Sequence, residues 1–312
     1  MTSFMKQAMR YLPLVLGISI LTVGALFVPW HQVAPYLARL TPLSYLIIAV
    51  LGTAFYTVRA VRYHYMLHRL KSPRSLRRMI VAYFEAQPIS LLPGGEAFRT
   101  VTLKKQANVP LADGVPVVFL QSFTENVGLV VLALLSAIIL KQQAVVIFVA
   151  MIIYVLVLIL LRTKRTADRS RRILNKLPFV NLARNTYLKF IAKNNVLLSG
   201  YSLVVLLLSG LISSLVASLL LFLVAKDMNI SLTFPEAVIA FSLPTALQNV
   251  TFLPGGIGVN EQSSVGVLVL LGVHFPAAVA LTIIIRAVTL ALGIILGLGA
   301  IALAKIHPRL ES

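Results

Sequence analysis

The stretch LLPGGEAFR at residues 91–99 interrupts one apolar segment of the chain, and LPGGIGVNE at residues 253–261 interrupts another. The arms beside each Pro-Gly-Gly turn are too short to cross a hydrocarbon core about 30 Å thick. We therefore expect two helical hairpins, 79–108 and 234–273, that enter the membrane and return on the same side. Interrupted backbone at membrane depth is tolerated only when buried in protein or lining a wet cavity, so these hairpins are the first places to look for function.

The amino-acid composition of the whole chain is that of a membrane protein. Of the 312 residues 59% are hydrophobic and only 12% are charged, whereas a soluble domain is about 25% charged. The chain has no cysteine, which excludes disulfides, thiolate metal sites and thiol catalysis. Apolar segments long enough to span a bilayer lie at 11–30, 43–63, 115–140, 144–161, 196–225 and 275–304. The first is interpreted as an uncleaved span, because no small-x-small cleavage site closes it.

The basic residues indicate the orientation. Lys+Arg 28 against Asp+Glu 9 gives a formal net charge of +19, and most of the basic residues fall in segments that six spans and two hairpins place in the cytoplasm. The largest of these segments is a basic loop, 162–195. We expect a multi-pass protein of the cell (inner or plasma) membrane with both termini cytoplasmic. The basic excess then contacts anionic lipid headgroups rather than nucleic acid.

Two parts of the chain are arranged alike. Residues 43–140, with the hairpin 79–108, and residues 196–305, with the hairpin 234–273, each hold a span, a hairpin and a further span, and 109–129 can be laid over 273–293 without a gap. The two units run in opposite directions through the membrane. The sequence therefore predicts a single all-α integral membrane domain, 1–312, built as an inverted repeat, which is the plan of many secondary transporters.

Four ordered motifs carry a resemblance to a known family: VRAVRY at 58–63, the two Pro-Gly-Gly stretches and Arg286. Together they resemble the flippase-like membrane domain of the lysylphosphatidylglycerol synthase (multiple peptide resistance factor) family in its stand-alone form. The resemblance implies lipid handling. Because only residues 305–312 follow the last span, the family's aminoacyl-lipid transferase half is absent and we expect no enzyme. The chain departs from the family pattern at Gln121-Ser122, where an acidic-basic pair is common, and has Glu125 one turn later.

Ionisable side chains inside spans are costly, by about 2.5–3.5 kcal/mol on the insertion scale, and usually face the bundle interior. Guanidinium groups suit a lipid phosphate as bidentate donors, and the Gly-Gly turns lead into helix N-termini that favour an anion. The candidate headgroup-binding residues are Arg59, Arg62, Gly94, Gly95, Glu96, Arg99, Glu125, Gln248, Asn249, Gly255, Gly256, Gly258, Asn260, Glu261 and Arg286.

A structural interpretation of the same residues stays open. Glu96 and Arg99 lie three residues apart and can pair with each other, and Arg286 is the obvious countercharge for Glu261. The two Pro-Gly-Gly sequences can also serve only as turns of the chain, with no binding role. His64 and His68 lack further ligands nearby, so we expect no metal, and no motif for a nucleotide or another cofactor occurs.

The leading functional hypothesis is a flippase or transporter that moves a phospholipid or a polyprenyl-type (glyco)lipid between leaflets. Its expected partners are membrane lipids, anionic phospholipid or a lipid-linked substrate above all, and a homodimer is a further possibility. One alternative is a membrane scaffold for a separate lipid-modifying enzyme. Another is a secondary transporter for small solutes or ions on the same inverted-repeat plan.

Overall fold

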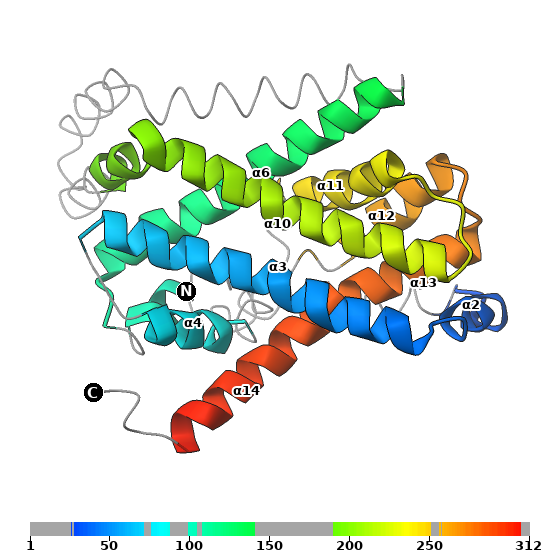
Figure 1. The fold of residues 1–312 in the computed structure, drawn as a ribbon, viewed down its shortest axis with the longest axis horizontal. Coiled ribbons are helices and arrows are strands. Elements are labelled where there is room, and N and C mark those ends of the chain that lie inside the picture. Colours follow the sequence, from blue (N-terminus) through cyan, green and yellow to red (C-terminus); the bar gives the residue numbers. More distant parts are fainter. Residues whose placement is uncertain are drawn as a thin grey trace, which may run out of the picture.

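The computed structural model describes residues 26, 28–71, 76–87, 99–104, 108–140, 190–250, 256 and 258–306, and every regular element within them is helical. Short helical stretches also occupy 99–104 and 190–197. The named elements in Figure 1 are α2 (Trp30–Leu37), α3 (Pro42–Arg69), α4 (Leu76–Glu85), α6 (Leu111–Ile139), α10 (Gly200–Asp227), α11 (Phe234–Val250), α12 (Val259–Leu270), α13 (Phe275–Arg286), the π-helical turn η3 (Ala287–Leu292) and α14 (Gly293–Ile306).

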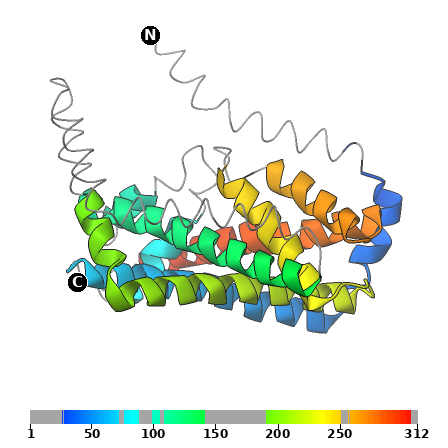
Figure 2. The ribbon, with the colours of Figure 1, turned by 90° about the horizontal axis from the view of Figure 1, so that it is seen from above.

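Four of the predicted spans are confirmed as helices that are long and apolar enough to cross a membrane. They are Pro42–Arg69, Leu111–Ile139, Gly200–Asp227 and Phe275–Ala300, the last running through α13, η3 and most of α14. In Figure 2 these helices run roughly along the length of the molecule, and α10 packs on both α3 and α6. The predicted span 144–161, and nearly all of the span 11–30 and of the basic loop 162–195, lie outside the described residues, so the count of six remains a prediction.

The helices begin where the sequence supplies a start. Thr41 caps α3, since its hydroxyl accepts from the Ser44 amide at 3.4 Å, and Pro42 fills the first helical position. Pro110 before α6 and His274 before α13 share nearly the same backbone angles, φ −56° with ψ 139° and φ −57° with ψ 137°. The two helices thus start at positions that match in the overlay of 109–129 on 273–293.

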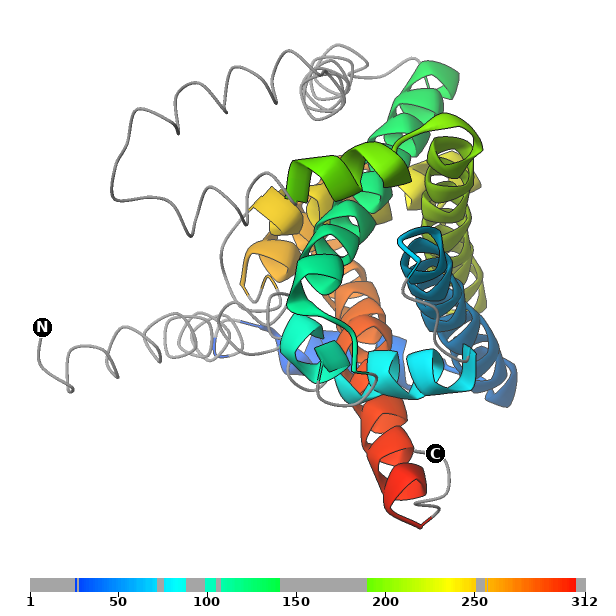
Figure 3. The same cartoon turned by 90° about the vertical axis from the view of Figure 1, so that its left-hand side faces the viewer.

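Helices of each predicted unit pack on helices of the other unit. The first hairpin's α4 packs on α14 of the second unit, and the second hairpin's α11 packs on α6 of the first. The leading helices α3 and α10 lie against each other, as the end-on view in Figure 3 also shows. This reciprocal pattern is the one that a two-fold relation between the units produces. No membrane accompanies the structure, so the inverted arrangement and the re-entrant depth of the hairpins stay predictions.

The second hairpin is a pair of short helices, α11 and α12, packed against each other. At about 1.5 Å per residue, each falls short of a core about 30 Å thick. Gly256 has φ +64°, and a Cβ there would lie 1.9 Å from Gln248 Cγ, so this turn requires glycine. Of the first hairpin the structure describes α4 and 99–104, while its tip, with Gly94, Gly95 and Glu96, lies outside the described residues, as does Gly255.

Glycines set how closely the units meet. A Cβ on Gly210 of α10 would lie 2.6 Å from the Thr124 carbonyl oxygen of α6, and a Cβ on Gly128 would lie 2.9 Å from the Gly210 carbonyl carbon. On the other side of the molecule, a Cβ on Gly52 of α3 would lie 2.5 Å from Leu292 Cδ2. Small residues let helix backbones approach within the membrane, where packing rather than water drives association.

We expect Gly210→Ala to lower the stability of the fold by about 1–3 kcal/mol, because the added methyl group meets backbone that cannot move aside. Thermal unfolding in detergent micelles, followed by circular dichroism, measures the change. Gly266→Ala on α12 is the matched control, because nothing lies within 4 Å of its added Cβ and alanine favours a helix more than glycine does. Equal melting temperatures for the two variants would show that the α6–α10 crossing is not tightly packed.

Candidate functional site

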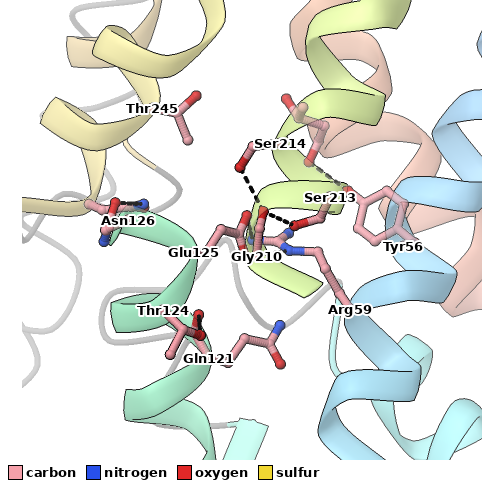
Figure 4. A network of polar contacts seen from close by, with 12 residues as sticks. Tyr56, Arg59, Gln121, Thr124, Glu125, Asn126, Gly210, Ser213, Ser214 and Thr245 are labelled. Carbon is pink, nitrogen blue, oxygen red and sulfur yellow. Dashed lines mark hydrogen bonds and ion pairs between the residues drawn. The ribbon is translucent and has the colours of Figure 1, made fainter. Parts of the chain in front are cut away.

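One carboxylate in the interior holds two arginines. Arg59 contacts both carboxylate oxygens of Glu125, with its Nε 2.9 Å from Oε2 and its Nη2 2.7 Å from Oε1. Arg62 Nη2 lies 2.9 Å from the same Oε2. The side chains of Arg62 and Glu125 are 0% and 3% exposed and that of Arg59 is 20% exposed. In Figure 4, Arg59 reaches from α3 toward Glu125 on α6. Glu125 is therefore the countercharge of both arginines.

The cluster carries more donor capacity than Glu125 uses. Nε and Nη1 of Arg62 find no hydrogen-bond partner within the part of the chain that the structure describes, nor does either atom of the Gln121 amide, one turn away on α6. Within the described residues, two guanidinium groups converge on the Glu125 carboxylate. A buried donor without a partner costs about 1–3 kcal/mol, so this place favours an anion or ordered water.

The second predicted pair is confirmed. Arg286 Nε donates to Glu261 Oε1 at 2.5 Å, and Glu261 Oε2 accepts the Gly258 amide at 2.6 Å, which closes the first turn of α12. Gln248 joins the pair, since its Oε1 accepts from Asn260 Nδ2 at 2.6 Å and from Arg286 Nη1 at 3.4 Å. At 21% exposure Glu261 is the more accessible of the two paired carboxylates.

A single amide contact links the two ion pairs. Asn126 follows Glu125 on α6, Asn249 follows Gln248 on α11, and Asn249 Nδ2 donates to Asn126 Oδ1 at 2.7 Å. A row of polar side chains therefore crosses α3, α6, α11, α12 and α13, in three contact groups that follow one another along the chain at Glu125-Asn126 of α6 and at Gln248-Asn249 of α11. We call it the polar band, and its members are Arg59, Arg62, Glu125, Asn126, Gln248, Asn249, Asn260, Glu261 and Arg286.

Arg99 belongs to a neighbouring group rather than to the Glu125 cluster. Its Nη2 donates to Gln87 Oε1 at 3.2 Å, and its guanidinium lies over the Tyr83 ring at 5.7 Å from the centroid. Arg99, a candidate headgroup-binding residue, therefore lies beside Gln87 and Tyr83. Since Glu96 lies outside the described residues, the Glu96–Arg99 pair stays a prediction.

Two site residues escaped the sequence reasoning. Asn126 had a signal, because it adjoins Glu125, the ionisable residue of that span. Tyr56 is buried, and its hydroxyl donates to the Thr289 carbonyl of η3 at 2.7 Å. The guanidinium groups of Arg59, Arg99 and Arg286 all lie within electrostatic range of that hydroxyl. Tyr56 and Arg59 are three residues apart and share a helix face, a spacing that could have marked it.

Long apolar helices around a partly buried polar band define a multi-pass membrane protein with a polar site among its helices. A sequence model described as the lysylphosphatidylglycerol synthase TM region matches residues 14–297. The chain belongs to this family, a membrane domain associated with lipid handling, so the family resemblance is confirmed. Comparison with curated proteins gives no match, and comparison with solved structures gives none either.

We expect Glu125→Gln to destabilise the protein by about 3–5 kcal/mol, because two buried guanidinium groups lose their countercharge. Unfolding in mixed micelles with increasing sodium dodecyl sulfate measures the free energy. The double variant Arg62→Gln with Glu125→Gln recovers part of that loss, since it removes one of the uncompensated charges. Glu261→Gln serves for comparison and costs less, because Glu261 is more exposed and holds one arginine. A Glu125→Gln protein as stable as wild type would mean that the cluster is not desolvated.

Proposed function

We propose that the protein moves a lipid between the leaflets of the membrane, as a flippase or transporter for a phospholipid or a polyprenyl-type (glyco)lipid. The polar band carries this proposal. A polar site among the spanning helices gives a headgroup hydrogen-bonding partners at the middle of the bilayer while the acyl chains stay in lipid. Membership of a family associated with lipid handling supports the same function.

The arginines suit the phosphate of a headgroup. A guanidinium group presents its donors in a planar fork that matches two phosphate oxygens. Arg59 is the partly exposed member of the Glu125 cluster, and Arg62 behind it keeps unused donors among the described residues. A phosphate that reaches Arg59 therefore meets further positive charge deeper in the protein, which favours inward movement.

The amides suit the remainder of the headgroup. Asn249 is exposed and Gln248 is half-buried, and both lie on α11 between the two ion pairs. Carboxamides donate and accept hydrogen bonds without carrying charge. A headgroup held between Glu125 and Glu261 at the middle of the bilayer thus has polar partners on both sides instead of hydrocarbon.

The arrangement of the units supplies a route for alternating access. Glu125 lies near the middle of α6, and Arg286 near the middle of the last spanning helix. Substrate sites of inverted-repeat transporters lie at this depth, and rocking of one unit against the other opens them to each side in turn. In this proposal the protein acts without catalysis, lies in the cell membrane with both termini in the cytoplasm, and can work beside a lipid-modifying enzyme or as a homodimer.

The test uses pure protein in liposomes that contain a phospholipid labelled on its headgroup. We expect the label to move between leaflets, and Arg59→Lys to slow the movement about tenfold, because an ammonium group cannot replace the bidentate fork. Bleaching of the outer-leaflet label by dithionite measures the rate. Arg69→Gln is the matched control on the same helix, because Arg69 is exposed and outside the polar band.

The other functions predict different outcomes. Folded protein that leaves the lipid in place but passes ions or sugars would identify a small-solute transporter. Folded protein that moves nothing, together with loss of binding to a partner enzyme on Arg286→Ala substitution, would identify a scaffold. Either result rejects lipid translocation.

A further inference from the structure

The last spanning helix contains a π-helical turn directly after a residue of the polar band. η3 occupies Ala287–Leu292, so it begins where α13 ends at Arg286. A π turn carries one residue more than an α turn, it is rare, and it occurs frequently at functional sites. Its widened backbone leaves carbonyl groups without their usual partners. Within a bilayer such groups need another donor, because no water replaces it.

Tyr56 of α3 supplies that donor. Its hydroxyl lies 2.7 Å from the Thr289 carbonyl oxygen, and only 2% of the residue is exposed. Packing around the bond is tight, since a Cβ on Gly293 would lie 2.4 Å from the Tyr56 hydroxyl and a Cβ on Gly52 would lie 2.5 Å from Leu292 Cδ2. α3 therefore holds the π turn by a hydrogen bond and by close contact.

The π turn sets the angle between two parts that pack on different neighbours. α13 lies against α12 and α2, whereas α14 lies against α4. Arg286 is the last residue of α13, and its contacts with Glu261 and Gln248 depend on how α13 is rotated. Conversion of η3 to α-helix removes the extra residue from the turn. It thereby turns α13 by about 100° relative to α14, because each residue of a helix with 3.6 residues per turn corresponds to a rotation of about 100°.

We propose that Tyr56 is a positioning residue for lipid translocation, which holds η3 in its π form and so directs Arg286 into the polar band. When the bond to Thr289 is lost, η3 becomes α-helical and Arg286 turns away from Glu261. This inference deepens the proposed function and rests on it for its role in transport, while the change in helix rotation is measured by itself.

An anionic headgroup is the natural trigger for the change. The positive charges of Arg59, Arg99 and Arg286 act on the Tyr56 hydroxyl, which donates to the Thr289 carbonyl. An anion drawn to these guanidinium groups also meets the hydroxyl. A phenol has a single proton to donate, so the anion and the Thr289 carbonyl compete for it. Headgroup binding and the π turn are then alternatives.

The absence of cysteine from the chain makes the rotation measurable. Spin labels at Phe275→Cys on α13 and Leu298→Cys on α14, both exposed positions, report the rotation of α13 against α14 by double electron–electron resonance in nanodiscs. We expect Tyr56→Phe to move the distance distribution by roughly 5–10 Å, as a rotation of about 100° on a helix 10–12 Å wide implies. Tyr65→Phe on the same helix is the matched control, because its hydroxyl binds Ser202 Oγ instead, and it leaves the distance unchanged.

Gly293→Ala breaks the same hydrogen bond without changing Tyr56, since its methyl group displaces the Tyr56 hydroxyl. It should reproduce the Tyr56→Phe distance. If folded Tyr56→Phe and Gly293→Ala proteins both keep the wild-type distance, the positioning role is wrong. In the wild-type protein, replacing neutral phosphatidylcholine by anionic phosphatidylserine in the nanodisc should shift the distance in the same direction. A distance that does not depend on lipid charge would show that an anionic headgroup does not compete with the Thr289 carbonyl for the Tyr56 hydroxyl.

The two proposals fail separately. A shifted distance in protein that moves no labelled lipid in liposomes supports the positioning of Arg286 and rejects lipid translocation. Lipid movement with an unshifted distance supports translocation and rejects the role of Tyr56.

Discussion

The pairing of one carboxylate with two arginines fixes much of this structure. Glu125 of α6 binds Arg59 and Arg62 of α3, and the side chains of Glu125 and Arg62 are almost fully buried. Separating α3 from α6 therefore leaves buried charge uncompensated, which costs more than the loss of an equal apolar contact. Gly128 and Gly210 then let α10 lie on α6 at the same level. Three spanning helices are thus held in one register by a few side chains.

The polar band extends this constraint to the second hairpin. The amide contact from Asn249 to Asn126 draws α11 onto α6, and Gln248 ties α11 to Asn260 and Arg286. Each of these contacts joins residues from different helices, so no single helix holds the band together. Apolar side chains of similar size could pack such a core at lower cost in desolvation. That the chain keeps a connected polar row instead is the physical argument for a polar substrate.

The sequence predicts the apolar framework well and the polar contacts in part. Long apolar runs identify four spans, and the rarity of ionisable residues inside them identifies Glu125 and the Arg286–Glu261 pair. α3 continues to Arg69, beyond the predicted end at 63, because polar and aromatic residues extend a helix that hydropathy alone ends early. Asn126 and η3 escaped prediction, since a neutral amide is unremarkable in one sequence and a π turn has no composition of its own.

The exchange of contacts between the units bears on how the chain assembles during synthesis. α6 emerges before α10 and α11, on which it packs, and α4 emerges long before α14. The Glu125 cluster joins α3 to α6, so its charges are paired within the first unit, whereas the α6 surface at Gly128 waits for α10. A chain that stops between the two units therefore keeps its buried charges paired but leaves this α6 surface without the helices that cover it.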